Sequence, residues 1–153
     1  MKHLCDSNVF LALVLESHPH HRCAKEWFDT FTDQDLAFLC RATQTSFLRL
    51  LTVKEWMKED VRTNAEALTV CRILLKDPRV EFLLDEPADL EAHWFNLAGV
   101  TQAAPRRWMD AYLAGFARTA GMRMVTFDRG FEQFQKKGLD LLVLSEVPPK
   151  GRS

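Results

Sequence analysis

Three aspartates stand where strand-like and helix-like segments of the chain meet. Asp6 lies within "LCDSNVFLAL", between a short apolar run and a run with helical spacing, and Asp128 directly follows another apolar run in "VTFDRGF". Asp110 lies early in the helical segment "MDAYLAGFA". Carboxylates at strand ends of an α/β sheet lie where ligands bind, and helix N-termini favour negative charge. Each aspartate taken alone also fits a helix cap or a turn residue.

Together, the three aspartates predict a more specific chemistry. The carboxyl ends of parallel strands share one edge of a sheet, so Asp6 and Asp128 can converge there, and Asp110 near a helix start can join them. Clustered carboxylates repel one another unless they are protonated or bound to a cation. A hard divalent cation accepts oxygen ligands, and it can activate water and stabilise charge on a phosphate. The pattern therefore favours metal-dependent phosphodiester hydrolysis.

Alternating strand-like and helix-like segments must position these side chains. We expect strands over residues 2–5, 36–40, 80–84, 123–127 and 139–144. We expect helices near 8–15, over 21–31, from Thr43, over 63–77, over 87–99 with Pro87 in the first turn, over 106–121, and briefly after Asp128. This order predicts an α/β fold of three layers, α/β/α, around a mostly parallel sheet of about five strands. We expect one domain over residues 1–147 and a flexible tail over 148–153.

The composition of the chain limits how it could bind nucleic acid and where in the cell we expect it. The chain has 153 residues, 47% of them hydrophobic, with a formal net charge of −1, so contact with nucleic acid would need local patches or metal ions. No apolar run is long enough to span a membrane, and the first residues do not form a signal peptide, so we expect a cytoplasmic protein. The four cysteines lack CxxC spacing, and we expect neither disulfides nor structural zinc.

Several segments resemble a known family. "LCDSNVFLAL", "WMDAYLAGFA" and "MVTFDRGF" are similar to the first, third and fourth acidic motifs of PIN-domain ribonucleases, especially the VapC toxins of bacterial toxin–antitoxin pairs. "HHRCAKEWF" and "ATQTSFLRLLT" resemble connecting segments of one VapC branch, so the resemblance covers nearly the whole chain. It implies a PIN domain that binds Mg²⁺ or Mn²⁺ and cuts a structured RNA, a tRNA or an rRNA, to inhibit translation. It also implies a homodimer and a VapB-like antitoxin that blocks the site.

The resemblance assigns roles to residues at the motif positions. Asp6 and Asp110 would be metal ligands, and Asp128 would complete the cluster directly or through water. Asn8 would hold the first loop or the water shell of the metal, although it also fits a first-turn capping residue. Thr126 would hydrogen-bond to the carboxylates, although a β-branched residue also suits a strand for its own sake.

Gln44 departs from the family pattern. Many PIN nucleases have Glu at the start of the helix after the second strand, whereas Gln44 is neutral and offers only a carbonyl oxygen. The predicted site thus carries one negative charge fewer, which weakens the case for a second metal. Gln44 also motivates an alternative function, a catalytically weak or inactive PIN-fold module that binds RNA or protein. A phosphatase with Asp6 as nucleophile is a third hypothesis, but "DSN" lacks the second Asp that such enzymes use.

Histidines and arginines offer further candidates. His18, His20 and His21 surround Pro19 and could bind a transition metal or contact RNA or a second subunit, although they also fit a polar loop. Five arginines could grip phosphate or could be solvated surface charges: Arg49, Arg106, Arg107, Arg118 and Arg129.

The four tryptophans lie in segments with helical spacing. They are Trp27, Trp56, Trp94 and Trp108. We expect them to serve packing or dimer contact rather than base stacking.

Overall fold

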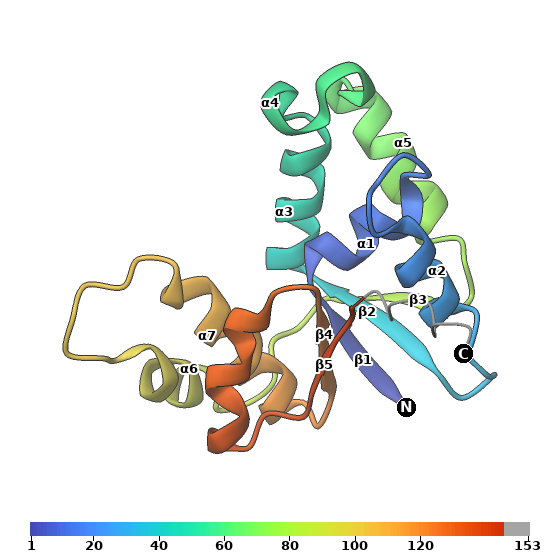
Figure 1. Cartoon of the computed structure of the whole chain (residues 1–153). Helices are drawn as coiled ribbons and strands as arrows, with labels where there is room; N and C mark the ends of the chain where they lie inside the picture. The colour runs from blue at the N-terminus through green and yellow to red at the C-terminus, as the bar shows by residue number, and fades with distance from the viewer. Residues whose placement is uncertain (146–153) are drawn as a thin grey trace, which may run out of the picture.

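A five-stranded parallel sheet forms the centre of the computed structural model, which describes residues 1–145 (Figure 1). Its strands are β1 (Lys2–Cys5), β2 (Leu36–Cys40), β3 (Val80–Leu83), β4 (Arg123–Thr126) and β5 (Leu141–Val143). They lie in the order β3-β2-β1-β4-β5, and every neighbouring pair is parallel. The predicted sheet is therefore confirmed, while the predicted tail over residues 148–153 lies outside the described residues.

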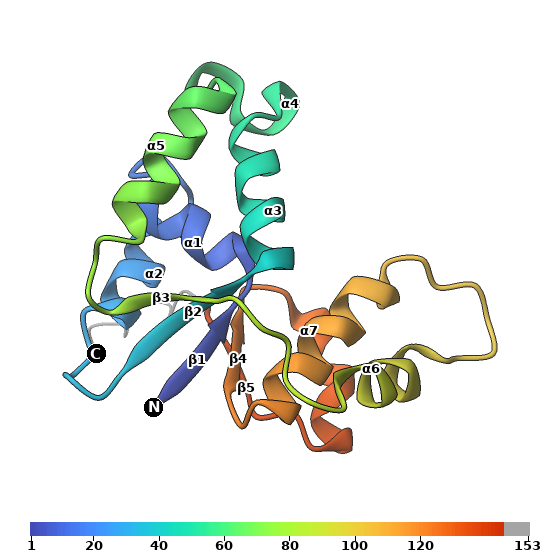
Figure 2. The same cartoon turned by 180° about the vertical axis from the view of Figure 1, so that it is seen from behind.

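Helices cover both faces of this sheet (Figures 1 and 2). They are α1 (Ser7–Val14), α2 (His21–Phe28), α3 (Arg41–Leu51), α4 (Lys54–Met57), α5 (Asn64–Leu74), α6 (Leu90–Ala98) and α7 (Arg107–Thr119), with 3₁₀ segments η1 (Lys58–Asp60) and η2 (Arg129–Lys137). Among the helices of residues 1–145, none has both the length and the hydropathy to cross a bilayer.

Alternate residues of the strands face two separate cores. Leu4 and Met124 belong to the core under α6, α7 and η2, whereas the next residues, Cys5 and Val125, belong to the core under α1, α2, α3 and α5. This alternation follows from the two-residue period of a strand, and it explains why the strands are apolar throughout. The three-layer α/β/α arrangement follows from it. The four cysteines are free thiols in this structure.

The direction of chain progression reverses at the middle of the sheet. From β1 the chain steps outward to β2 and β3, and it then crosses to β4 on the other side of β1 and ends in β5. In parallel sheets, ligands bind beyond the carboxyl ends of the two strands that flank such a reversal, here β1 and β4, and we call this region the crevice. Asp6 follows β1 directly, and Asp128 follows β4 by two residues, so both predicted site residues lie at this crevice.

Three local predictions need correction. The helix after β2 begins at Arg41 rather than Thr43, because the Thr43 hydroxyl bonds back to the Cys40 amide and carbonyl from within the first turn. Pro87 does not open α6, since Asp89 has a left-handed backbone (φ 63°) and the helix starts only after it. The short α4 and η1 segments have no counterpart in the sequence-based prediction.

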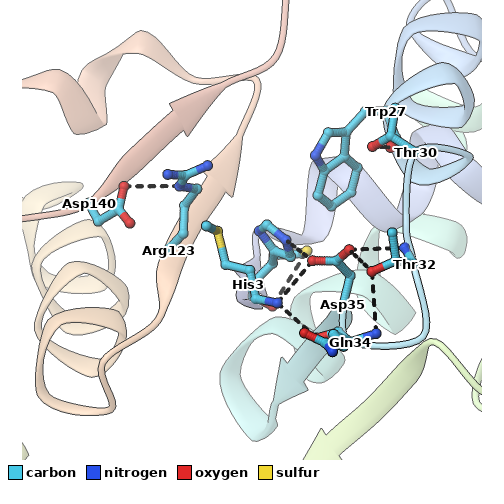
Figure 3. Close-up of polar contacts among 10 residues, drawn as sticks. His3, Trp27, Thr30, Thr32, Gln34, Asp35, Arg123 and Asp140 are labelled. Atoms are coloured by element: carbon cyan, nitrogen blue, oxygen red, sulfur yellow. Dashed lines mark hydrogen bonds and ion pairs between the residues drawn. The ribbon is translucent and has the colours of Figure 1, made fainter.

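The opposite, amino-terminal edge of the sheet holds a buried histidine (Figure 3). His3 is 5% exposed and packs between Trp27 and Phe31, with ring centroids 5.5 and 5.1 Å away. Its Nε2 lies 3.8 Å from Asp35 Oδ1, while its Nδ1 is buried with no hydrogen-bond partner among residues 1–145. Burial lowers the pKa of His3 below its ordinary value, although the charge of Asp35 acts in the opposite direction.

His3 should make the fold sensitive to mild acid. Since its pKa is lower in the folded than in the unfolded chain, its contribution to stability is present above the unfolded value of 6.5 and is lost as pH falls through the folded pKa. We expect the free energy of unfolding to fall between about pH 7 and about pH 5, and to fall less in His3→Phe, which keeps the ring stack. Urea unfolding at both pH values measures this. Equal pH dependence in the two proteins would contradict the assignment.

Candidate active site

Asp6 is fixed at the point where β1 turns into α1. Its backbone N–H donates to Val125 O at 2.9 Å, which extends the pairing of β1 with β4 by one residue. Asp6 is then the N-cap of α1, and its Oδ1 accepts a hydrogen bond from the Ser7 N–H at 2.8 Å. Asp6 therefore does cap the helix. The same conformation directs its second carboxylate oxygen, Oδ2, toward the end of β4.

Thr126 joins the ends of β1 and β4. Its hydroxyl donates to Asp6 Oδ2 at 2.9 Å and accepts the Asp128 N–H at 3.0 Å. The residue is fully buried, so the hydroxyl has no water to bond with and the polar contacts fix its orientation. Thr126 thus does more than fill a strand position, because it holds the Asp6 carboxylate and the backbone of Asp128 in one arrangement.

Asn8 forms a second link between the same two strand ends. Its Nδ2 lies 3.4 Å from both Asp6 Oδ2 and Thr126 Oγ1, and its Oδ1 accepts the Phe127 N–H at 3.3 Å. Both groups of the amide are therefore used across the β1–β4 junction. This geometry agrees with the predicted role of Asn8 in holding the loop rather than with a first-turn cap.

Asp128 directly precedes the 3₁₀ segment η2 and is its N-cap. Its Oδ1 accepts the Gly130 N–H at 2.7 Å, so Asp128 caps this turn. A Cβ at residue 130 would lie 3.0 Å from that oxygen, so any larger residue here would press on the Asp128 carboxylate. The turn leaves Asp128 Oδ2 free of hydrogen bonds with described residues.

Asp110 approaches the cluster from the first turn of α7. It forms no hydrogen bond with Asp6 or Asp128 within residues 1–145, but their charges act on it. Partial burial raises the pKa of Asp110 to about 6, with further contributions from the charges of Asp128 and Asp6, while Arg106 and Arg107 lower it. Asp110 is thus coupled to the other two carboxylates through charge rather than contact.

The donor set fits a hard divalent cation. Burial raises the pKa of Asp6 and the charge of Asp128 adds to this, while hydrogen bonds from Thr126 and Ser7 oppose it. None of the three carboxylates forms an ion pair within residues 1–145. The charges of Arg106 and Arg107 offset the repulsion at Asp110 only in part, since the pKa of Asp110 still lies above its ordinary value. In the same part of the chain, no group of three His, Cys, Asp or Glu side chains is close enough to enclose a metal. Mg²⁺ needs only one or two carboxylates plus water, so this open arrangement still suits it.

Gln44 has hydrogen-bond partners of its own at the start of α3. Its Oε1 accepts a hydrogen bond from Arg41 Nη1 at 2.6 Å, and its Nε2 lies 3.9 Å from Cys71 Sγ. It forms no hydrogen bond with a described residue of the carboxylate cluster. In this structure the side-chain oxygen of Gln44 is occupied by the hydrogen bond from Arg41.

The sequence analysis missed one residue that contacts the site. It also treated the three histidines as one group, although their contacts differ. Ser7 is 6% exposed and contacts Asp6 through both its N–H and its hydroxyl, a role that its place directly after an N-cap could have indicated. His20 stacks on Phe127 beside the site, with ring centroids 4.6 Å apart, whereas His21 Nδ1 bonds to Ala12 O. His18 lies next to His20, with ring centroids 5.7 Å apart, but within residues 1–145 the three histidines do not form a group that could enclose a metal.

Comparison with known proteins assigns the chain to a family. A model of the PIN domain matches residues 4–137. Ribonuclease VapC41 of Mycobacterium tuberculosis is 42% identical over 146 residues, which are 94% of this chain and 99% of that protein. Ribonuclease VapC38 of the same species is 30% identical over 145 residues, 92% and 98% of the two chains.

Solved structures share the fold at lower identity. VapBC2 of Rickettsia felis, bound to a DNA fragment from its promoter, matches with a TM-score of 0.65 at 13% identity and covers 95% of this chain and 100% of that chain. VapC20 of M. tuberculosis, a toxin that cleaves the sarcin–ricin loop, matches with a TM-score of 0.59 at 20% identity, covering 96% and 99%. The chain belongs to the PIN-domain family and, within it, to the VapC ribonucleases.

Proposed function

We propose that this protein is a metal-dependent endoribonuclease of the VapC type, which cuts a structured cellular RNA and thereby inhibits translation. One observation carries the proposal: Thr126 and Asn8 hold Asp6 and Asp128 together at the sheet crevice, where the charge of Asp110 is also felt. The similarity to a ribonuclease over nearly the whole chain supports it.

In phosphodiester hydrolysis, the aspartates would bind the metal ion, and Thr126 and Asn8 would orient them. Asp6, Asp110 and Asp128 would hold Mg²⁺ or Mn²⁺, Asp128 directly or through water. When bound, the ion supplies positive charge to the phosphate under attack and lowers the pKa of the attacking water. Thr126 and Asn8 keep Asp6 oriented, so that little reorganisation is needed when the substrate arrives. The charge count supports one metal better than two, because Gln44 adds no carboxylate.

The RNA substrate is proposed to be a tRNA or an rRNA with an accessible loop. VapC20, which shares the fold, cleaves the sarcin–ricin loop, and this supports a structured RNA as the substrate class. A chain with a net charge of −1 cannot attract RNA by bulk charge, so binding must rely on local basic side chains and the bound cation.

The proposed partners are a VapB-like antitoxin that blocks the site and a second copy of the toxin in a homodimer. Solved structures of the same fold include VapBC2 of R. felis and VapBC-1 of Haemophilus influenzae. An antitoxin bound over the carboxylates would block RNA cleavage, and cleavage would begin only after the antitoxin is removed. We place the protein in the cytoplasm, where its RNA substrates are.

Cleavage of total cellular RNA tests the proposed activity. We expect the purified protein, freed of any partner, to give discrete fragments with Mg²⁺ or Mn²⁺ and none with chelator, because an ion must offset the clustered carboxylates. Asp6→Asn should abolish the fragments while circular dichroism shows an intact fold. Mapping the fragment ends identifies the RNA.

The control separates the nuclease from the alternative function. Asp33→Asn removes an exposed carboxylate outside the cluster and should cleave like the parent. If folded, partner-free protein binds RNA but cuts none in either metal, the RNA-binding module is the better description, and Gln44→Glu becomes the next variant to make.

Thr126 provides a test of positioning. Thr126→Val keeps the shape of the side chain but removes the hydrogen bond to Asp6, and loss of such an outer-shell contact lowers activity by about 10- to 100-fold. Thr126→Ser retains the hydroxyl and should recover most of the rate. Initial cleavage rates at saturating metal measure the effect. Equal rates for the Val and parent proteins would show that the hydroxyl is dispensable.

A further inference from the structure

The loop between α1 and α2 places a histidine ring against the end of β4. His20 stacks on Phe127, with ring centroids 4.6 Å apart and an angle of 15° between the ring planes. Phe127 lies between Thr126 and Asp128, and the Asp128 N–H donates to the Thr126 hydroxyl. A side chain from the first part of the chain thus packs directly on the segment that carries two candidate site residues.

Hydrogen bonds with α1 and within the loop fix the backbone that carries this ring. His21 Nδ1 lies 2.7 Å from Ala12 O on α1, and the His18 N–H donates to Leu15 O at 3.0 Å. His18 Nδ1 accepts the His20 N–H, also at 3.0 Å, and only a neutral imidazole has a nitrogen that can accept. Burial lowers the pKa of His18, and the charges of His20 and His21 act in the same direction, so this neutral form is favoured.

The His20 ring is held by stacking rather than by hydrogen bonds with the described chain. His20 is the N-cap of α2, but its side chain forms no capping hydrogen bond. Its Nδ1 is buried and has no hydrogen-bond partner within residues 1–145, which costs free energy. The ring contacts that offset this cost are those with Phe127 and, at 5.7 Å between centroids, with His18.

Phe127 is tied into the candidate site through its backbone. Its N–H donates to Asn8 Oδ1 at 3.3 Å, and the following N–H, that of Asp128, donates to Thr126 Oγ1 at 3.0 Å. The first of these distances is long for an N–H···O hydrogen bond, so it alone constrains Phe127 weakly. The stack with His20 constrains the same residue from its side chain, and it therefore helps to set the direction in which the chain leaves β4.

We propose that His20 is a positioning residue of the candidate nuclease site, whose ring holds Phe127 and thereby keeps residues 126–128 in the geometry that RNA cleavage requires. The inference rests on the proposed ribonuclease function. Stacked ring pairs stabilise by more than the area they bury, and site groups must be held within about 0.5 Å of their productive positions. In this role the imidazole touches neither the RNA nor a metal ion, and its effect reaches Asp128 through the backbone.

Cleavage kinetics test this role. Initial rates are measured with purified total cellular RNA at a range of concentrations and at saturating Mn²⁺. We expect His20→Ala to lower kcat by about two- to tenfold, the range that one stacked ring pair contributes, and to leave KM unchanged. The split is expected because the ring affects the geometry of the site and makes no contact with RNA.

Matched variants separate the ring from its nitrogen atoms. His20→Phe keeps a flat ring and should recover most of the rate, whereas His20→Gln keeps a polar group without a ring and should be as slow as His20→Ala. His93→Ala removes a histidine of α6, on the other face of the sheet from α1 and α2 (Figures 1 and 2), and should cleave like the parent. A slow Phe variant, or a raised KM with unchanged kcat in His20→Ala, overturns the proposal, because the imidazole then acts through its nitrogens or on the RNA.

Amide hydrogen exchange separates failure of this inference from failure of the proposed function. By NMR, the Phe127 and Asp128 amides should exchange faster in His20→Ala than in the parent, and His20→Phe should restore their protection. Unchanged exchange at these two amides overturns the proposal even where the parent cuts RNA. Equal acceleration in β2 also overturns it, because the loss is then one of global stability. Absence of cleavage by the parent counts against the nuclease alone, since exchange does not depend on turnover.

Discussion

The carboxylate of Asp6 is partly buried at the end of β1, and a charge in that position is tolerated only where polar groups replace the lost hydration. Ser7 and Thr126 supply those groups, one from the start of α1 and the other from the end of β4. The arrangement therefore requires β1 and β4 to be adjacent and in register. The sheet order, the crevice and the remaining site contacts all depend on this pairing.

The fold was largely predictable from the sequence, because the spacing of apolar residues differs between strands and helices. Strands buried on both faces appear as short uninterrupted apolar runs, and "LAFLC" is such a run. Helix boundaries were less predictable: the left-handed backbone of Asp89 overrides the preference of Pro87 for a first turn. The brief α4 and η1 segments carry too few residues for a periodic pattern.

The candidate site residues came from two sources. The order of strands put Asp6 and Asp128 at one edge of the sheet, and the family resemblance added Asn8 and Thr126. Hydrogen bonds connect these four residues in the structure, but their roles in catalysis stay a prediction. The sequence could not indicate that Asp110 couples through charge alone, nor that Gln44 turns to Arg41, because both depend on side-chain directions set by tertiary packing. The same sheet persists in structures of 13% identity, which shows how little of it depends on particular side chains.

The contact between Asp6 and Thr126 spans 120 residues of the chain. On a ribosome, β4 emerges long after β1, so the contact cannot form on a chain that has not yet reached β4. Long-range pairing of this kind is also slow to form relative to local helices. A VapC ribonuclease built in this way lacks its linked pair of strand ends for as long as β4 is still unmade or unpaired.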